Sequence, residues 1–156
     1  MKSWNDFYIE KPELAKLGEK LLFQTPIGLA FLATIRKDGA PRLHPVSLVI
    51  SNGHLYVGIP TTSPKCGDLL RDGRYAMQAF PPPRNDEGEE FYLAGRAECI
   101  RDPAIRQALI EDTNIHLEEN EVLFEILLDR AMYKKLENQG TPEEWPIYVK
   151  WRVSIT

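Results

Sequence analysis

The segment Thr61-Thr62-Ser63-Pro64-Lys65 contains the residue types that a phosphate-binding site needs. It lies between an apolar run and a stretch with helical character, where a strand is expected to pass into a helix. A helix N-terminus offers unpaired backbone N–H groups and a partial positive charge. Ser63 could add a hydroxyl, Lys65 a full charge, and Arg42 a bidentate contact from the preceding strand. The segment therefore predicts a site for one phosphate group.

A simpler interpretation of the same segment stays open. Ser-Pro begins many helices, because Ser caps the N-terminus and Pro fits the first turn. Ser63 would then only cap the helix, and Lys65 would be a solvated residue of its first turn. The residue types and spacing of this segment are compatible with both roles.

The composition narrows the class of protein. At 156 residues the chain is expected to form a single domain, residues 1–156. A net charge of −4 argues against nucleic acid as a partner. No apolar run approaches the ~20 residues of a membrane span, and no signal-peptide core follows the first residues. Two cysteines without CxxC spacing form neither a disulfide framework nor a zinc site. We therefore expect a cytoplasmic protein that binds neither membrane nor nucleic acid.

The first half of the chain has the signals of an antiparallel meander. Leucines at helical spacing predict a helix from about Pro12 to Gln24. Asp38-Gly39 and Asn52-Gly53 favour the positive φ angles of two-residue hairpin turns. The strands expected around these turns are residues 29–35, 41–50 and 55–59.

The second half adds strands and short helices. A helix should open at Ser63-Pro64 and another after Asp102-Pro103. Further strands are expected at residues 74–80, 91–100 and 145–155. Residues 120–138 are ambiguous, because their composition favours helix while their apolar residues alternate as in a strand. Five or more antiparallel strands with few helices predict a closed barrel.

The order of these motifs resembles the flavin-binding core of the pyridoxamine 5′-phosphate oxidase-like family. The resemblance covers residues 27–108 and extends loosely over the rest. The similar features are the Asp38-Gly39 turn, the strand Pro41-Arg42-Leu43-His44-Pro45-Val46, the helix start Ser63-Pro64-Lys65, the stretch Leu69-Leu70-Arg71-Asp72-Gly73-Arg74, and the segment from Gly95-Arg96-Ala97-Glu98 to Asp102-Pro103.

The resemblance implies a mainly β fold, a six-stranded antiparallel split barrel with a few peripheral helices. It also implies strand for residues 120–132, and a homodimer that holds two FMN molecules at its interface. Arg42 and Lys65, assisted by Ser63, would bind the FMN phosphate. The remaining cofactor contacts that it implies are His44, Val46 and Ser47 along the isoalloxazine and ribityl, the backbone of Ile59 at the ring edge, and Gln78 as a further candidate. The implied activity is an FMN-dependent oxidoreductase that passes hydride through the flavin to or from a small organic substrate.

Departures from the family pattern limit the substrate. The vitamin-making oxidases carry a C-terminal Arg-x-His element that binds substrate, whereas this chain has no histidine after His116. Many oxidases also have a second basic residue where Pro64 stands here. We therefore do not expect pyridoxamine phosphate as the substrate.

Two alternatives to FMN chemistry remain open. The same fold could hold the deazaflavin F420, or the chain could be a non-catalytic flavin- or heme-binding protein. Heme would need an axial ligand from His44, His54 or His116, and the spacing nominates none of them.

Other reactive side chains fit structural roles better. Cys66 is expected to be a partly buried, inert thiol, since no His-Asp pair accompanies it. His116, among acidic residues but without a second histidine at ligand spacing, predicts a solvated loop rather than a metal site. The sequence also lacks a glycine-rich dinucleotide motif. The absence of a paired acid and base fits a flavoprotein, because the cofactor performs the electron chemistry.

Overall fold

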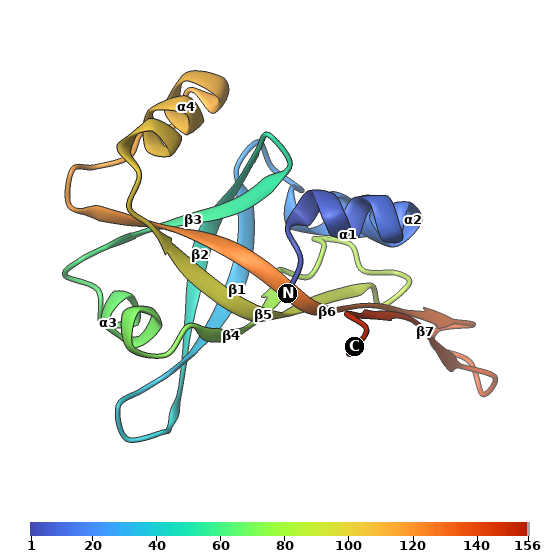
Figure 1. The fold of residues 1–156 in the computed structure, drawn as a ribbon. Coiled ribbons are helices and arrows are strands. Elements are labelled where there is room, and N and C mark those ends of the chain that lie inside the picture. The colour runs from blue at the N-terminus through green and yellow to red at the C-terminus, as the bar shows by residue number, and fades with distance from the viewer. Residues whose placement is uncertain (156) are drawn as a thin grey trace.

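Two helices precede the first strand in the computed structural model, which describes residues 1–155 (Figure 1). α1 (Trp4–Glu10) was not predicted, whereas α2 (Pro12–Leu22) lies where the leucine spacing placed it. A capping box begins α1: the Asp6 N–H donates to Ser3 Oγ at 3.1 Å, and the Ser3 N–H donates to the Asp6 carboxylate at 3.0 Å. Ser-x-x-Asp before an apolar stretch is the sequence signal for this helix.

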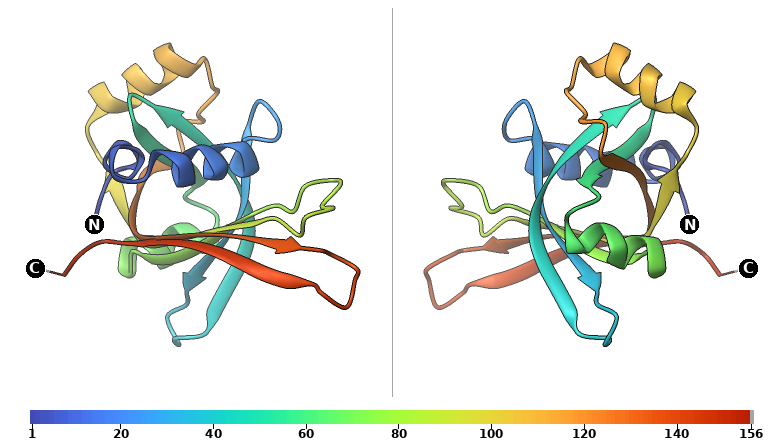
Figure 2. Two further views of the ribbon diagram at one scale, coloured as in Figure 1. Left: turned by 90° about the vertical axis from the view of Figure 1, so that its right-hand side faces the viewer. Right: turned by 90° about the vertical axis from the view of Figure 1, so that its left-hand side faces the viewer.

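The strands form one antiparallel sheet that closes on itself. They are β1 (Gly28–Ile35), β2 (Pro41–Ser51), β3 (His54–Pro60), β4 (Arg74–Ala79), β5 (Glu90–Ile100), β6 (Glu121–Glu137) and β7 (Trp145–Arg152). Their order is β3-β2-β1-β4-β5-β6-β7, and β3 also pairs with β6. The strands β1 to β6 therefore close a six-stranded ring, which confirms the mainly β split-barrel prediction. The expected closing strand, β7, lies outside the ring and extends beyond it with β6 (Figure 2).

The ambiguous segment is the strand β6, as the family resemblance implied. Its 17 residues pair with β5 along one edge. Along the other edge they pair first with β3 and then with β7. These ladders satisfy the backbone on both sides, so tertiary pairing overrides a helix-favouring composition.

The two hairpin turns differ. Asn52 and Gly53 both have positive φ, 49° and 78°, as the two-residue turn requires. At the β1–β2 connection only Gly39 has a positive φ, 86°, and the loop extends from Arg36 to Ala40. The Gly39 N–H donates to the Arg36 carbonyl at 2.9 Å. The expectation of a two-residue turn at Asp38-Gly39 was wrong, because Asp38 keeps a negative φ and Gly39 supplies the left-handed position alone.

Helices cover the barrel at both ends and on one side. α1 and α2 lie at one end, and α3 (Pro64–Arg71) lies at the other (Figure 1). α4 (Pro103–Thr113) packs on the outside, where its Leu109 contacts Tyr56 and Leu123. Among residues 1–155, no helix is long and apolar enough to cross a membrane.

Candidate functional site

The ring is only partly closed between β2 and β3. These strands pair only over Val49–Ser51 and His54–Tyr56. The preceding residues of β2, 41–48, pair with β1 alone, and the later residues of β3, 57–60, pair with β6. Within the described residues, no strand pairs with β2 along this part of its free edge. An unpaired edge presents backbone N–H and C=O groups that a ligand can use. We call this opening the split.

Seven of the eight predicted cofactor residues border the split or the helix that follows it. Those on the open edge of β2 are Arg42, His44, Val46 and Ser47; Ile59 lies on β3, and Ser63 and Lys65 lie at the start of α3. Gln78 is the exception. It lies on β4, separated from β2 by β1, and faces outward between Phe31 and Tyr92 in the ladders.

Strand alternation divides the β2 residues between two faces. Arg42, His44 and Val46 lie opposite residues of β1 that are buried in the barrel. Ser47 points to the outer face and is exposed. Since neighbouring side chains of a strand point to opposite faces, Val46 and Ser47 cannot both direct side chains at one face of a flat ring. One of them must contact such a ring through its backbone.

A pocket of about 550 Å³ lies on the outer side of the split. It is lined by Ser47 from β2, Gly58 from β3 and residues 114–117 after α4, so it spans the gap between the two strands. Its volume falls within the range of about 300–1,000 Å³ that small-molecule sites occupy. The outer side of the split therefore has room for a flat cofactor ring.

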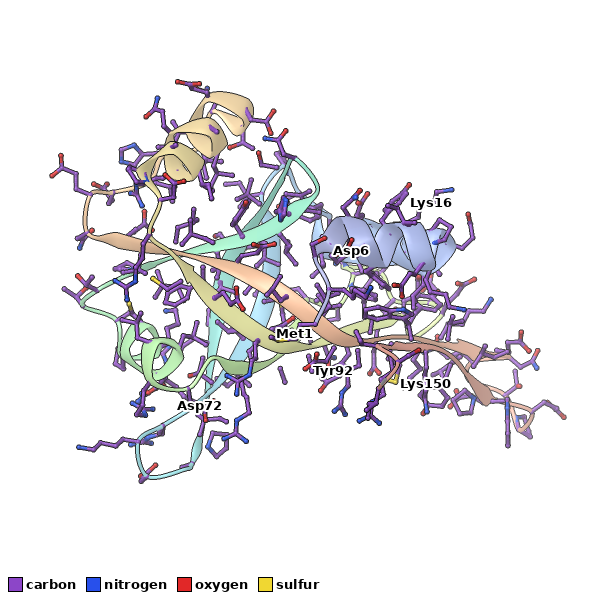
Figure 3. All side chains as sticks on the ribbon, viewed as in Figure 1. Met1, Asp6, Lys16, Asp72, Tyr92 and Lys150 are labelled. Carbon is purple, nitrogen blue, oxygen red and sulfur yellow. The ribbon has the colours of Figure 1, made fainter. Side chains whose placement is uncertain are left out.

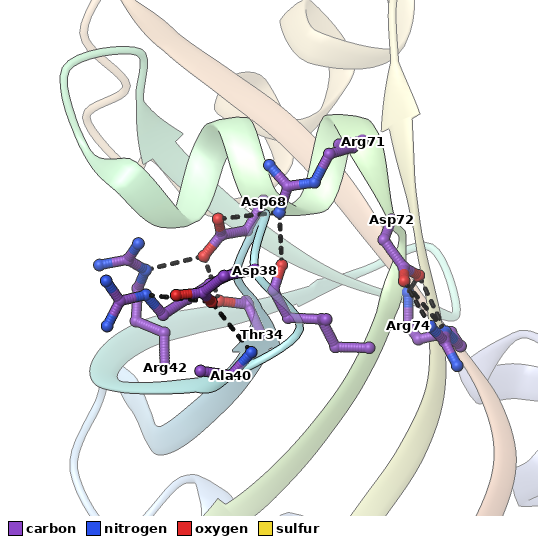
Figure 4. Close-up of polar contacts among 10 residues, drawn as sticks. Thr34, Asp38, Ala40, Arg42, Asp68, Arg71, Asp72 and Arg74 are labelled. Atoms are coloured by element: carbon purple, nitrogen blue, oxygen red, sulfur yellow. Dashed lines mark hydrogen bonds and ion pairs between the residues drawn. The ribbon is translucent and has the colours of Figure 1, made fainter.

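A buried carboxylate organises the α3 end of the barrel (Figure 4). Asp68 is 3% exposed and accepts hydrogen bonds from Arg42 Nε at 2.7 Å, Thr34 Oγ1 at 2.8 Å and Arg71 Nη2 at 3.1 Å. Burial alone would raise the pKa of Asp68, but these three donors outweigh it and hold the pKa below its usual value. Asp68 thus fixes the position of Arg42 and shares its charge. Asp68 is not among the site residues that the sequence predicted. The only sequence signal for it is an acidic residue on the inner face of an amphipathic helix.

Lys65 is a cation at the start of α3 that lacks such compensation. Its Nζ donates to Ser63 Oγ at 3.0 Å. Within residues 1–155, no carboxylate lies within ion-pair distance of it. Burial lowers the pKa of Lys65 below its usual value. A partly buried ammonium without a counter-charge at a helix start is suited to bind an anion.

Ser63 does not act as a simple N-cap of α3. Its backbone has the extended conformation of an N-cap residue, yet its hydroxyl makes no capping hydrogen bond. The Ser63 hydroxyl instead accepts from Lys65 and remains at the start of the helix. Together, Ser63, Lys65 and the first turn of α3 fit a phosphate group.

The alternative reactive groups have structural roles. Burial raises the pKa of the Cys66 thiol, as expected of an inert cysteine. His116 is exposed and lies 2.8 Å from Glu118. In the described part of the chain, no group of three His, Cys, Asp or Glu side chains could hold a metal ion.

An apolar strip runs across the outer face of β2, β1, β4 and β5. The ladders place Leu43, Ala33, Ala76 and Ala94 in one row across the strands, and Pro45, Phe31, Gln78 and Tyr92 in the next. Leu43 is 66% exposed, and Phe31 is 36% exposed and stacks on Phe80 at 4.3 Å. The second row continues through Met132 to Lys150, on the side of β5–β7 where Figure 3 labels Tyr92 and Lys150. We call this surface the apolar strip.

The fold is shared with several solved structures. No protein-family model matches the sequence, and no curated protein sequence matches it either. An F420 reductase is similar over 72% of this chain and 94% of its own, with 21% identity and a TM-score of 0.54. A NimC/NimA family protein from Clostridium acetobutylicum is similar over 86% of this chain and 94% of its own, with 13% identity and a TM-score of 0.55.

A heme-binding protein from Mycobacterium smegmatis is similar over 84% of this chain, with 16% identity and a TM-score of 0.59. The match spans 57% of that protein, a little over half of its length. At these identities the likenesses establish the split-barrel fold.

Proposed function

We propose that this chain is a cytoplasmic FMN-binding flavoprotein of the pyridoxamine 5′-phosphate oxidase-like family, an oxidoreductase that acts on a small organic substrate. The observation that carries the proposal is Lys65, an uncompensated and partly buried cation at the start of α3, the helix whose Asp68 holds Arg42 of β2. A phosphate group is the anion that such a helix start most commonly binds.

The phosphate would be held from two sides. Lys65 supplies the unshared charge, Ser63 its hydroxyl, and the start of α3 the positive end of the helix dipole. Pro64 has no backbone N–H, and the Cys66 N–H donates to the Ser63 carbonyl at 3.0 Å. Arg42 contributes through its terminal nitrogens, because its Nε is held by Asp68. A bound flavin would supply the electron chemistry, and the residues of this chain would bind and orient it.

The ring would lie along the split. His44 and Val46 border it on the inner face of β2, Ser47 on the outer face, and Ile59 offers backbone from β3. The free edge of β2 provides hydrogen-bonding groups for the polar edge of the ring. The pocket between Ser47 and Gly58 would shield one ring face from water.

A second copy of the chain would complete the site. The apolar strip exposes Leu43 and Phe31 next to the split, and contiguous exposed apolar surface typically marks an interface. Gln78 lies in this strip, so in a homodimer it would face the partner copy. Leu43→Asp is expected to convert the dimer to monomers in light scattering, whereas Ile9→Asp, at a 70% exposed site on α1, should not.

Heme is the second candidate cofactor, and the contacts of the three histidines favour one of them as its axial ligand. His54 Nδ1 lies 2.6 Å from Glu125, and His116 Nε2 lies 2.8 Å from Glu118. His44 has no such carboxylate contact in the part of the chain that the structure describes, and it borders the split. A heme-binding role, without catalysis, would use His44 as the axial ligand. F420 in place of FMN would occupy the same split.

An absorbance spectrum of the purified protein, followed by titration with FMN, tests the proposal. Lys65→Glu should weaken FMN binding by roughly a hundredfold, since it replaces a charge-assisted contact by repulsion. Lys11→Glu, at an exposed site between α1 and α2, is the matched control and should bind FMN normally. Unchanged affinity in Lys65→Glu would contradict the phosphate assignment.

Substrate-dependent reduction of the bound flavin would support an enzyme. Bound flavin that small organic substrates never reduce would support a non-catalytic carrier. A Soret band lost in His44→Ala would instead support heme.

A further inference from the structure

A second hollow, of about 590 Å³, lies beside the proposed phosphate site but does not include it. It is bounded by the β1–β2 turn, the C-terminal end of α3, and the adjoining strands β4 and β5 (Figure 4). Its charged lining consists of Arg36, Lys37, Arg71, Arg74, Arg96 and one acid, Asp72. Arg42, Ser63 and Lys65 do not line it. The chain has a net charge of −4, so this concentration of cations in one hollow indicates an anion-binding site.

The acids near the hollow compensate only part of this charge. Arg36 Nε lies 3.8 Å from Asp38, and Arg71 is bonded to the buried Asp68. Lys37 and Arg96 make no ion pair with any of the residues that the structure describes.

Two of the cations oppose each other directly. Arg74 and Arg96 are cross-strand partners in the β4–β5 ladder, a position in which like charges destabilise a sheet. Asp72 accepts from Arg74 Nη2 at 2.6 Å and from its Nε at 3.0 Å. These hydrogen bonds are the main cause that lowers the pKa of Asp72 to about 2, and the nearby charge of Arg96 adds to them. Arg96 therefore has only the longer-range attraction of Asp72 and no ion pair of its own among the described residues.

The arginine of the helix end is held in place. Arg71 Nη2 donates to the Ile35 carbonyl at 2.5 Å and to Asp68 at 3.1 Å. The ion pair with Asp72 likewise orients Arg74. Two of the cations are therefore positioned before any ligand binds, which reduces the entropy cost of binding.

We propose that this hollow binds a small polyanion that carries two or more phosphate groups. Its cations stand on separate walls: Arg36 and Lys37 on the turn, Arg71 on the helix, and Arg74 and Arg96 on the sheet. Because the cations come from three separate elements, a ligand with several phosphate groups offers more acceptors to them than a single phosphate does. Because the side chains are partly exposed, binding will weaken as salt is raised.

Calorimetric titration of the full chain with orthophosphate, pyrophosphate and tripolyphosphate at low salt tests the inference. Tripolyphosphate should bind saturably and more tightly than orthophosphate. Arg96→Gln should weaken that binding about tenfold, as expected for one lost charge-assisted contact. Arg101→Gln, at an exposed arginine outside the hollow, is the matched control and should bind as the wild type does.

Thermal unfolding gives a second test that needs no ligand. Arg96→Gln removes the repulsion with Arg74 and should therefore raise Tm by about 1–3 °C while it lowers the affinity for tripolyphosphate. A variant that loses affinity through misfolding would lower Tm instead.

The site is separable from the proposed FMN site. Lys65→Glu should retain tripolyphosphate binding, and saturating FMN should not compete. Loss of binding in Lys65→Glu, equal loss in Arg101→Gln, or equal affinity for orthophosphate would overturn the inference. Tighter binding of an oligonucleotide than of tripolyphosphate at 150 mM salt would also overturn it.

Discussion

The two ends of the barrel are closed by different physical means. At the α1–α2 end, Trp4, Phe7, Leu21 and Leu22 are almost completely buried. Phe7 lies 5.3 Å from the ring centre of Trp4 and 4.8 Å from that of Trp151. At the α3 end, Cys66 and Leu69 are buried too, but a buried carboxylate, Asp68, lies on the same helix and accepts from Arg42 and Arg71.

This difference links the α1–α2 end of the barrel to stability and the α3 end to binding. Apolar burial is favourable, and the indole N–H groups at the α1–α2 end are paired, since Trp4 Nε1 donates to Glu19 and Trp151 Nε1 donates to Glu10. A buried carboxylate must be fully hydrogen-bonded to be tolerated, and the groups that satisfy Asp68 bring positive charge to the surface beside the split. The α3 end thus combines a buried, hydrogen-bonded carboxylate with a positively charged surface that can bind anions.

The α1–α2 end is also closely packed. A Cβ on Gly18 of α2 would lie 2.3 Å from the ring of Phe91. Gly18 therefore lets the helix approach the barrel closely, although glycine lowers helix propensity.

The largest expected effect is the loss of Phe7. Phe7→Ala removes a fully buried ring and should cost about 3–5 kcal/mol of unfolding free energy in urea denaturation. Ile9→Ala, at a 70% exposed site of the same helix, should be neutral. FMN affinity of the folded Phe7→Ala protein should not change; a large loss of affinity would show that the two ends are coupled.

Asp68→Asn should cost about 2–3 kcal/mol, because Arg42 and Arg71 lose the carboxylate that balances them. The folded pKa of Asp68 is lowered, so its contribution is complete above the ordinary value of 3.8 and is lost as pH falls through the lower folded value. Urea denaturation between pH 3 and 7 should therefore show a smaller acid loss of stability in Asp68→Asn. Identical pH profiles would contradict this account of the α3 end.

Lys65 should make FMN binding sensitive to alkaline pH. The pKa of Lys65 is lowered by burial, so its charge is lost at lower pH than the charge of an exposed lysine. We expect FMN affinity to fall about tenfold as Lys65 deprotonates. Fluorescence titrations from pH 7 to 10 measure this, and Lys65→Arg is the matched control because arginine stays charged. A parallel fall in both proteins would show that Lys65 is not responsible.

The smallest expected effect distinguishes two helix starts. Asp102 caps α4, since its Oδ1 accepts from the Ala104 N–H at 2.9 Å, and Asp102→Ala should cost about 1 kcal/mol. Ser63 makes no such bond at α3, so Ser63→Ala should cost less than about 0.5 kcal/mol while it weakens FMN binding. Equal costs in urea denaturation would mean that the Ser63 hydroxyl acts as an ordinary cap.

The sequence by itself determined the local elements. Asn52-Gly53 predicted its turn, Pro12 and the leucine spacing predicted α2, and Asp102-Pro103 predicted the start of α4. These signals are local, since each depends on the φ preferences or the periodicity of a few neighbouring residues. The same kind of local signal, Ser3-x-x-Asp6, precedes α1.

Only the tertiary structure decided how these elements combine. β6 has a helix-favouring composition and became a strand because β5, β3 and β7 pair with its two edges. Asp68 became the centre of the α3 end because folding brings Thr34 and Arg42 from the sheet to the helix. Gln78 was separated from the split by β1. Such outcomes depend on contacts between residues that are distant in the sequence, and a pattern read along one segment does not contain them.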